Sequence, residues 1–127
     1  MRNAGLLLTL VVMLAVPSAQ AASCMRSNAD GAIAEGRLSL GQFEDAAGRP
    51  EQAFILTLPA PTCLSGEDDM DNVDDVETIH VFSVDALHAG LDEFVGKDVQ
   101  VRGTPIPAHT AHHHAPIVMS ITEIDGL

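Results

Sequence analysis

Four histidines on one short segment are the residues of this chain best suited to chemistry. His109, His112, His113 and His114 lie in the sequence His-Thr-Ala-His-His-His, just before an apolar run from Pro116 to Ile121. Neutral imidazoles are common ligands for borderline metals, and several on one segment lower the entropy cost of assembling a site. The segment therefore predicts a metal site, for which Zn²⁺, Cu²⁺ and Ni²⁺ are suitable ions.

The spacing also predicts how these histidines are arranged. If the extended geometry of the apolar run continues back through Pro116, His112 and His114 point to one face and His113 points to the other. We expect His109 to fold back and join His112 and His114, which leaves a fourth position for water, an acidic side chain or a partner. One alternative is a structural role, in which the ring nitrogens bond the carbonyls of the loop and the neighbouring strands. Adventitious metal binding and protonation near pH 6 are the others.

Alternating apolar residues predict the strands that position this loop. An Asp85 cap and a Gly96 stop predict a short helix between them. The expected elements are strands at 34–40, 54–58 and 78–84, a helix at 85–95, and strands at 97–103 and 117–121. This order is that of an OB-fold, so the predicted fold is mainly β, a small five-stranded OB-like barrel with one short helix between its third and fourth strands. An open sheet with one packed helix is the competing architecture.

Several local features refine this expectation. A polar, turn-rich stretch follows from Gly41 to Pro50, and Pro59-Ala60-Pro61 is expected to end the second strand, because proline cannot donate to a ladder. The helix is expected to bury one stripe of apolar residues, and two further histidines are expected to be ordinary strand and surface residues rather than ligands. The stripe is Leu87, Leu91, Phe94 and Val95, and the two histidines are His80 and His88.

The segment from Ser65 to Glu77 carries seven acidic residues and almost no apolar ones. Mutual repulsion predicts an extended, solvated loop. Calcium binding is the alternative, but the spacing lacks the Asp-x-Asp-x-Asp-Gly order of a helix-loop-helix calcium site.

The first 21 residues resemble a secretory signal. Arg2 supplies a positive charge, residues 6–16 an apolar core, and Ala19-Gln20-Ala21 a cleavage site. A retained anchor is the alternative, although the apolar run is about half the roughly 20 residues that a spanning helix needs. We therefore expect residues 22–127 to form one domain located in the periplasm or secreted.

In an oxidising compartment, Cys24 and Cys63 are expected to form a disulfide. Lipidation of Cys24 is the rival, since Ala21-Ala22-Ser23-Cys24 is a degenerate lipoprotein pattern. A metal-binding role is disfavoured because the two cysteines are not in a close Cys-x-x-Cys pair.

Charge and composition exclude some classes of partner. The chain has 18 acidic residues against six Lys and Arg, a formal net charge of −12, and no Trp or Tyr. Such a surface repels phosphate backbones, and it lacks the exposed aromatic platforms that nucleic acids or sugars would stack on. A basic envelope protein or a metal ion is the expected partner, and a solvated acidic surface that aids solubility is the equal alternative. No nucleophile elbow or His-Glu-x-x-His motif is present, so we expect no enzymatic activity.

The histidine segment resembles the C-terminal signature of exported bacterial proteins classed as domain-of-unknown-function family 4431. In that family a Gly-Thr-Leu segment leads into a His-Thr-Gly-His-His-His-Thr-Pro-Val motif, to which Gly103-Thr104 and residues 109–118 are similar. Residues 54–63, with Ile-Leu-Thr-Leu before a cysteine, and residues 92–101 are similar as well. Ala111 and Ala115 depart from the motif's Gly and Thr, and Pro105-Ile106-Pro107 interrupts it. The resemblance implies the fold and an envelope location but no activity.

The sequence thus predicts a small exported binding module that binds a transition metal, Zn or Cu, or presents a recognition surface through its histidine loop. The alternative is an envelope protein-interaction module of the inhibitor or immunity type, whose acidic face covers a basic partner.

Overall fold

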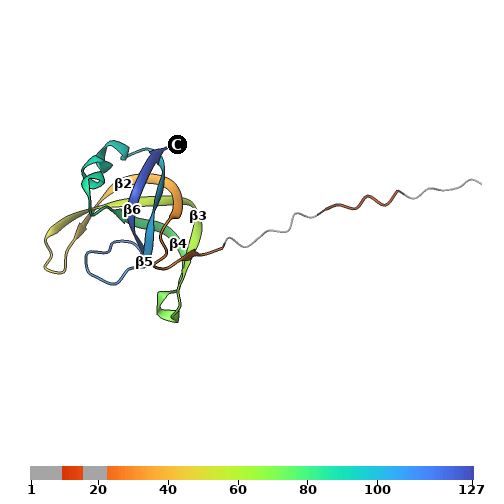
Figure 1. The fold of residues 1–127 in the computed structure, drawn as a ribbon, viewed down its shortest axis with the longest axis horizontal. Coiled ribbons are helices and arrows are strands. Elements are labelled where there is room, and N and C mark those ends of the chain that lie inside the picture. The colour runs from red at the N-terminus through yellow and green to blue at the C-terminus, as the bar shows by residue number, and fades with distance from the viewer. Residues whose placement is uncertain (1–9, 16–22) are drawn as a thin grey trace, which may run out of the picture.

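Five strands close into a barrel around the core. The computed structural model describes residues 10–15 and 23–127. The elements are β1 (Met25–Arg26), β2 (Ala32–Glu44), β3 (Pro50–Ser65), the 3₁₀ helix η1 (Asp69–Asp71), β4 (Val73–Phe82), the 3₁₀ helix η2 (Ala86–Phe94), β5 (Asp98–Pro107) and β6 (Ile117–Gly126). The hydrogen-bonded order is β3-β2-β5-β6-β4, and the pairing of β3 with β4 closes it (Figure 1). The predicted mainly β five-stranded barrel, with one short helix between its third and fourth strands, is confirmed, and the open sheet is excluded.

Most of the predicted signal segment, residues 1–9 and 16–21, lies outside the described residues. Within 10–15 and 23–127, no helix is both long enough and apolar enough to cross a bilayer.

Alternate residues of each strand point into the barrel, as the period-two pattern predicted. On β6, for example, Ile117, Met119 and Ile121 are all buried, and Val99 and Val101 of β5 are fully buried. Burial of a Val, Leu or Ile side chain contributes about 1.5–3 kcal/mol relative to exposure, so these rows provide the main driving force for closure. The other fully buried side chains of the core cluster are Leu38, Leu56, Leu64, Val76, Ile79, Val81 and Leu91.

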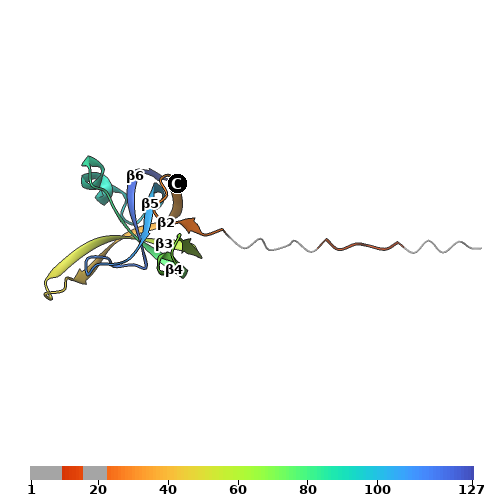
Figure 2. The same cartoon turned by 60° about the horizontal axis from the view of Figure 1, so that its bottom comes forward.

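The β2–β3 hairpin is longer than predicted and projects beyond the barrel (Figure 2). The turn expected from Gly41 is wrong, because β2 continues to Glu44 and pairs with β3 down to Pro50. The turn itself is held by the Asp45 carboxylate, which accepts the N–H groups of Ala47 and Arg49, both at 2.9 Å. Because side chains alternate, Phe43, Glu51 and Ala53 share one face of the hairpin, and Leu40, Gln52 and Phe54 share the other.

The prolines after Leu58 do not end the strand, so that prediction is wrong. β3 continues to Ser65. Its pairing with β2 stops at Thr57, and its pairing with β4 skips from Thr57 to Thr62. Pro59 and Pro61 therefore lie in an irregular stretch where no ladder bond needs their missing N–H.

The same reasoning explains why β5 runs past Gly103, where the sequence predicted its end. Its pairing with β2 stops at Gly103, while its pairing with β6 continues to Pro107. Pro105 and Pro107 thus have one free side, on which a missing N–H costs no ladder bond.

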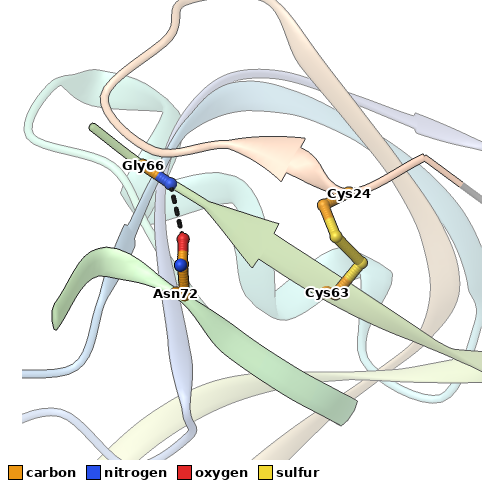
Figure 3. The surroundings of a disulfide bond; sticks show 4 residues. All are labelled: Cys24, Cys63, Gly66 and Asn72. Atoms are coloured by element: carbon orange, nitrogen blue, oxygen red, sulfur yellow. Dashed lines mark hydrogen bonds between the residues drawn. A yellow bond between two sulfur atoms is a disulfide. The ribbon is translucent and has the colours of Figure 1, made fainter. Parts of the chain in front are cut away.

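The acidic segment is only partly a loop. Residues 66–72 contain η1, and the N–H of Gly66 donates to the side-chain oxygen of Asn72 at 3.0 Å (Figure 3). From Val73 onward the prediction of a solvated loop is wrong, because β4 begins there and Val76 is fully buried. Asp74, Asp75 and Glu77 are exposed, so the strand forms without burying their charges.

The predicted short helix is present as the 3₁₀ helix η2. The Asp85 carboxylate accepts the N–H of Leu87 at 2.8 Å, as expected of a cap, and Gly96 follows with φ +83°. Leu91 is fully buried, whereas Val95 is 38% exposed. Val95 is the one predicted stripe residue that is wrong, since the tighter helix ends before it.

Candidate functional site

The histidine loop, residues 108–116, connects β5 to β6 and is closed at its base. The N–H of Ala108 donates to the carbonyl of Pro116 at 3.0 Å, and inside the loop the N–H of His113 donates to the carbonyl of Thr110 at 3.1 Å. These bonds fix a turn that presents the three consecutive histidines. The loop lies alongside the β2–β3 hairpin (Figure 2).

Two of these histidines bind one carboxylate of the hairpin. His112 Nδ1 lies 2.6 Å from Glu51 Oε1, and His114 Nε2 lies 2.8 Å from Glu51 Oε2. We call these three residues the Glu51 clasp. His112 and His114 thus reach the same carboxylate, although they lie in a turn and not on the continuing strand from which a shared face was predicted. The carboxylate comes from the hairpin.

The surroundings keep the clasp carboxylate ionised. The hydrogen bond from His114, followed by that from His112, lowers the pKa of Glu51, and partial burial opposes this only weakly. The side chain of His114 is 8% exposed, that of Glu51 27% and that of His112 67%. The clasp therefore has a buried arm, His114, and an exposed arm, His112.

His114 is fixed between two rings. The Phe43 ring stacks on it at 4.2 Å with an interplanar angle of 7°, and the His80 ring lies on it at 5.8 Å and 25°. The N–H of His114 also donates to His80 Nδ1 at 3.2 Å. Ala53, Ile55 and Ala115 form the small apolar cluster beneath, against which Phe43 packs.

His80 is half-buried on β4, as predicted, but it belongs to the histidine cluster, which sequence reasoning missed. Burial, together with the charges of His114 and His113, lowers the pKa of His80 to about 4. Its ring is therefore neutral at physiological pH, and Nδ1 stays available as an acceptor for His114.

His109 and His113 form a separate pair. The N–H of His109 donates to His113 Nδ1 at 3.0 Å, and the rings meet edge to face at 4.7 Å. His109 Nδ1 also bonds the carbonyl of Pro107 at 3.2 Å. Burial, and then repulsion by the neighbouring histidines, lowers the pKa of His113. His109 thus lies against His113 and does not join His112 and His114 as we expected.

The four loop histidines do not form one set of metal ligands. His112 and His114 contact Glu51, and His109 contacts His113. Across the described ranges 10–15 and 23–127, no three His, Cys, Asp or Glu side chains are grouped so that they hold a metal ion as they stand. The donors of the Glu51 clasp are joined by hydrogen bonds instead. Chemically, the clasp is a preformed set of two imidazole nitrogens and one carboxylate.

The two cysteines form the predicted disulfide. Cys24 and Cys63 are bonded, with Cα atoms 4.6 Å apart, where β1 pairs in parallel with the end of β3 (Figure 3). The Cys24 sulfur is therefore engaged in a protein bond and not in a lipid bond. A disulfide is consistent with an extracellular protein.

These features define a small, disulfide-bonded all-β barrel with a histidine-rich loop at its rim. Residues 78–125 match the model of a family described as a domain of unknown function (DUF4431), which confirms the predicted resemblance. No curated protein and no solved structure matches the chain.

Proposed function

We propose that this protein is an exported, non-catalytic binding module that takes up a divalent transition metal ion, Zn²⁺ or Cu²⁺, at the Glu51 clasp. One observation carries the proposal: two imidazole nitrogens from one loop converge on a single carboxylate from a different element. Imidazole nitrogen and carboxylate oxygen are the donors that both ions accept.

The surroundings favour metal uptake at this place. His114 is already held by Phe43 and His80, so little conformational entropy is lost when it binds. His112 is largely exposed and can shift from its hydrogen bond to Glu51 into coordination. A bound metal ion would displace the protons that now form the hydrogen bonds of His112 and His114 with Glu51.

The location in the fold supports a binding role. OB-folds bind ligands on the face of their second and third strands, between the loop that joins strands one and two and the loop that joins strands four and five. Here those strands are β3 and β4, and those loops are the β2–β3 hairpin and the histidine loop. The Glu51 clasp joins the same two loops.

Titration calorimetry with ZnCl₂ and CuCl₂ on the oxidised, untagged domain tests the proposal. We expect one ion per chain, and affinity reduced at least tenfold in Glu51→Gln, His112→Ala and His114→Ala. His109→Ala, in the same loop but outside the clasp, is the matched control and should bind as wild type does. Several weak sites, or equal losses for all four variants, would show adventitious binding and reject the proposal.

A second candidate is an interaction surface for a basic envelope protein, at the connection between β3 and β4. Met70 is 91% exposed at this connection, between acidic side chains that are exposed or nearly so. An apolar residue surrounded by charges of one sign is a plausible anchor for a cationic partner. The acidic residues are Glu67, Asp68, Asp69 and Asp71.

A pull-down from envelope extract at low and high salt distinguishes this candidate. The expected result is a basic partner retained by wild type, released by salt, and lost in the combined variant Asp68→Asn, Asp69→Asn, Met70→Ser. Neutralising Glu35, Glu93 and Asp125, which are exposed elsewhere, is the control for general charge. If that control loses the partner equally, the connection is not the site.

A further inference from the structure

The face of the β2–β3 hairpin that carries Leu40, Gln52 and Phe54 borders a cleft. The histidine loop lies on the opposite face, with Glu51. The last pair between β3 and β4 joins Phe54 to Val81, so Gln52 and Ala53 beyond it pair with β2 alone. The helix η2 lies across from this free edge. Between them is a cleft of about 320 Å³, lined by both elements and by His80. This volume is at the lower end of the range for small-molecule sites.

Three polar side chains at this cleft have hydrogen-bonding capacity to spare. The Gln52 amide donates to Gln42 at 3.3 Å, which leaves its oxygen as an acceptor. His88 Nδ1 accepts the N–H of Ser83 at 3.4 Å, which leaves Nε2 available. The Asp92 carboxylate makes no hydrogen bond or ion pair with any residue in 23–127.

The charge of the cleft selects the ligand. No Lys or Arg lines it, and the chain has a net charge of −12. An anionic ligand would be repelled, while a cation is attracted towards Asp92. The floor is apolar, formed by Leu40, Phe54 and Val81. A short hydrocarbon chain fits this floor better than a hydrated metal ion does.

We propose that this cleft binds a small organic cation, in which an ammonium group pairs with Asp92 and a short alkyl chain lies on Leu40 and Phe54. The Gln52 oxygen accepts a second N–H of the ligand. The proposed ligand contacts no residue of the Glu51 clasp and needs no metal there, although His80, which lines the cleft, also accepts the N–H of His114.

Calorimetry with 1,4-diaminobutane on the full, oxidised domain in the presence of a chelator tests this site. Butane-1,4-diol is the matched neutral compound, because it has the same chain with hydroxyl groups in place of the ammonium groups. We expect 1:1 binding of the diamine, weaker at high salt, and at least tenfold weaker binding of the diol. Absence of diamine binding, or equal binding of the diol, would overturn the proposal.

Two neighbouring substitutions separate a specific site from general attraction to an acidic protein. Asp92→Asn keeps the shape of the side chain and should weaken diamine binding at least tenfold, while its thermal midpoint shows that it folds. Glu93→Gln removes one charge next to it, from a residue that does not line the cleft, and should leave the affinity within twofold. Equal losses in both variants would mean that the diamine binds as a counterion only, and the site would be rejected.

Discussion

At the residue scale, Glu51 holds the histidine loop to the hairpin. Its two oxygens each bond a different histidine, one exposed and one buried. Bonds that involve an ionised partner are roughly twice as strong as neutral ones. The position of the loop therefore depends on one charge that lies 61 and 63 residues away from its two partners.

Glu51→Gln should destabilise the metal-free protein at pH 7, because it removes the charged acceptor of two hydrogen bonds. The pKa of Glu51 in the folded protein lies below its ordinary value of 4.5. Its contribution is therefore complete above pH 4.5 and is lost as the pH falls through the folded-state value. Urea unfolding from pH 7 to pH 3 measures this. The difference in free energy of unfolding between wild type and variant should shrink as the pH falls below 4.5, and a constant difference would contradict it.

His80 also lowers the stability of the fold on acidification, because its pKa is depressed in the folded protein. Its pKa is about 4 in the folded protein against 6.5 ordinarily, so below pH 6.5 the unfolded chain binds a proton that the folded protein does not. Wild type should lose about 1 kcal/mol more than His80→Gln between pH 6.5 and pH 5, after allowance for solvent screening. Thermal melts in a chelating buffer compare the two proteins. Parallel pH profiles would show that His80 is not held in its neutral form.

At the element scale, the positions of β5 and β6 depend on close backbone contact. A Cβ at Gly103 would lie 2.1 Å from the carbonyl oxygen of Ser120, on the paired strand. The pairing of β5 with β6 has its register shift at this point, between Arg102 and Gly103. The histidine loop joins the end of β5 to the start of β6, so a change in the distance between these strands would displace the loop.

Gly103→Ala should therefore destabilise the fold by about 2–4 kcal/mol. The backbone of Ser120 and Ile121 on β6 leaves no room for a methyl group, and pairing with β2 on the other side prevents β5 from moving away. Gly126→Ala is the matched control. That glycine pairs with Val99 on the same two strands, and a Cβ there meets nothing within 4 Å. Urea unfolding of both variants gives the comparison. A Gly103→Ala protein as stable as the control would show that the strands separate easily.

At the scale of the whole molecule, the barrel closes through β3 and β4, and the disulfide ties the N-terminal segment to it. The bond joins residues 39 positions apart. In the chain-entropy model a loop of this length stabilises the folded state by about 4 kcal/mol. This is a large share of the 5–15 kcal/mol that is typical of a domain.

Replacing both Cys24 and Cys63 by Ala should lower the free energy of unfolding by about 4 kcal/mol. Urea unfolding of the variant, and of wild type with and without a reductant, measures the loss. The reductant should shift the midpoint of wild type and leave that of the variant unchanged. Mass spectrometry of the protein purified without reductant that found both thiols free would contradict the pairing.

Much of the fold is local in origin and therefore readable from the sequence. Period-two alternation marks a strand wherever one face is buried, so five strands, the Asp85 cap and the Gly96 stop could all be placed. The pairing of two cysteines in an oxidising compartment has only one intramolecular solution. The ends of the strands could not be placed, because whether Pro59 or Pro105 breaks a ladder depends on which neighbour lies beside it.

The histidine motif was enough to locate the candidate site in the loop between the last two strands. The tertiary structure alone showed that His112 and His114 contact Glu51. No local pattern relates Glu51, near the start of β3, to His112 and His114, because the hairpin and the loop meet only when the barrel closes. The same closure brings His80 of β4 beside His114, whereas the contact of His109 with His113 forms within the loop itself. Short-range alternation is a property of neighbouring residues, whereas the chemistry of this site arises between segments that only the folded chain brings together.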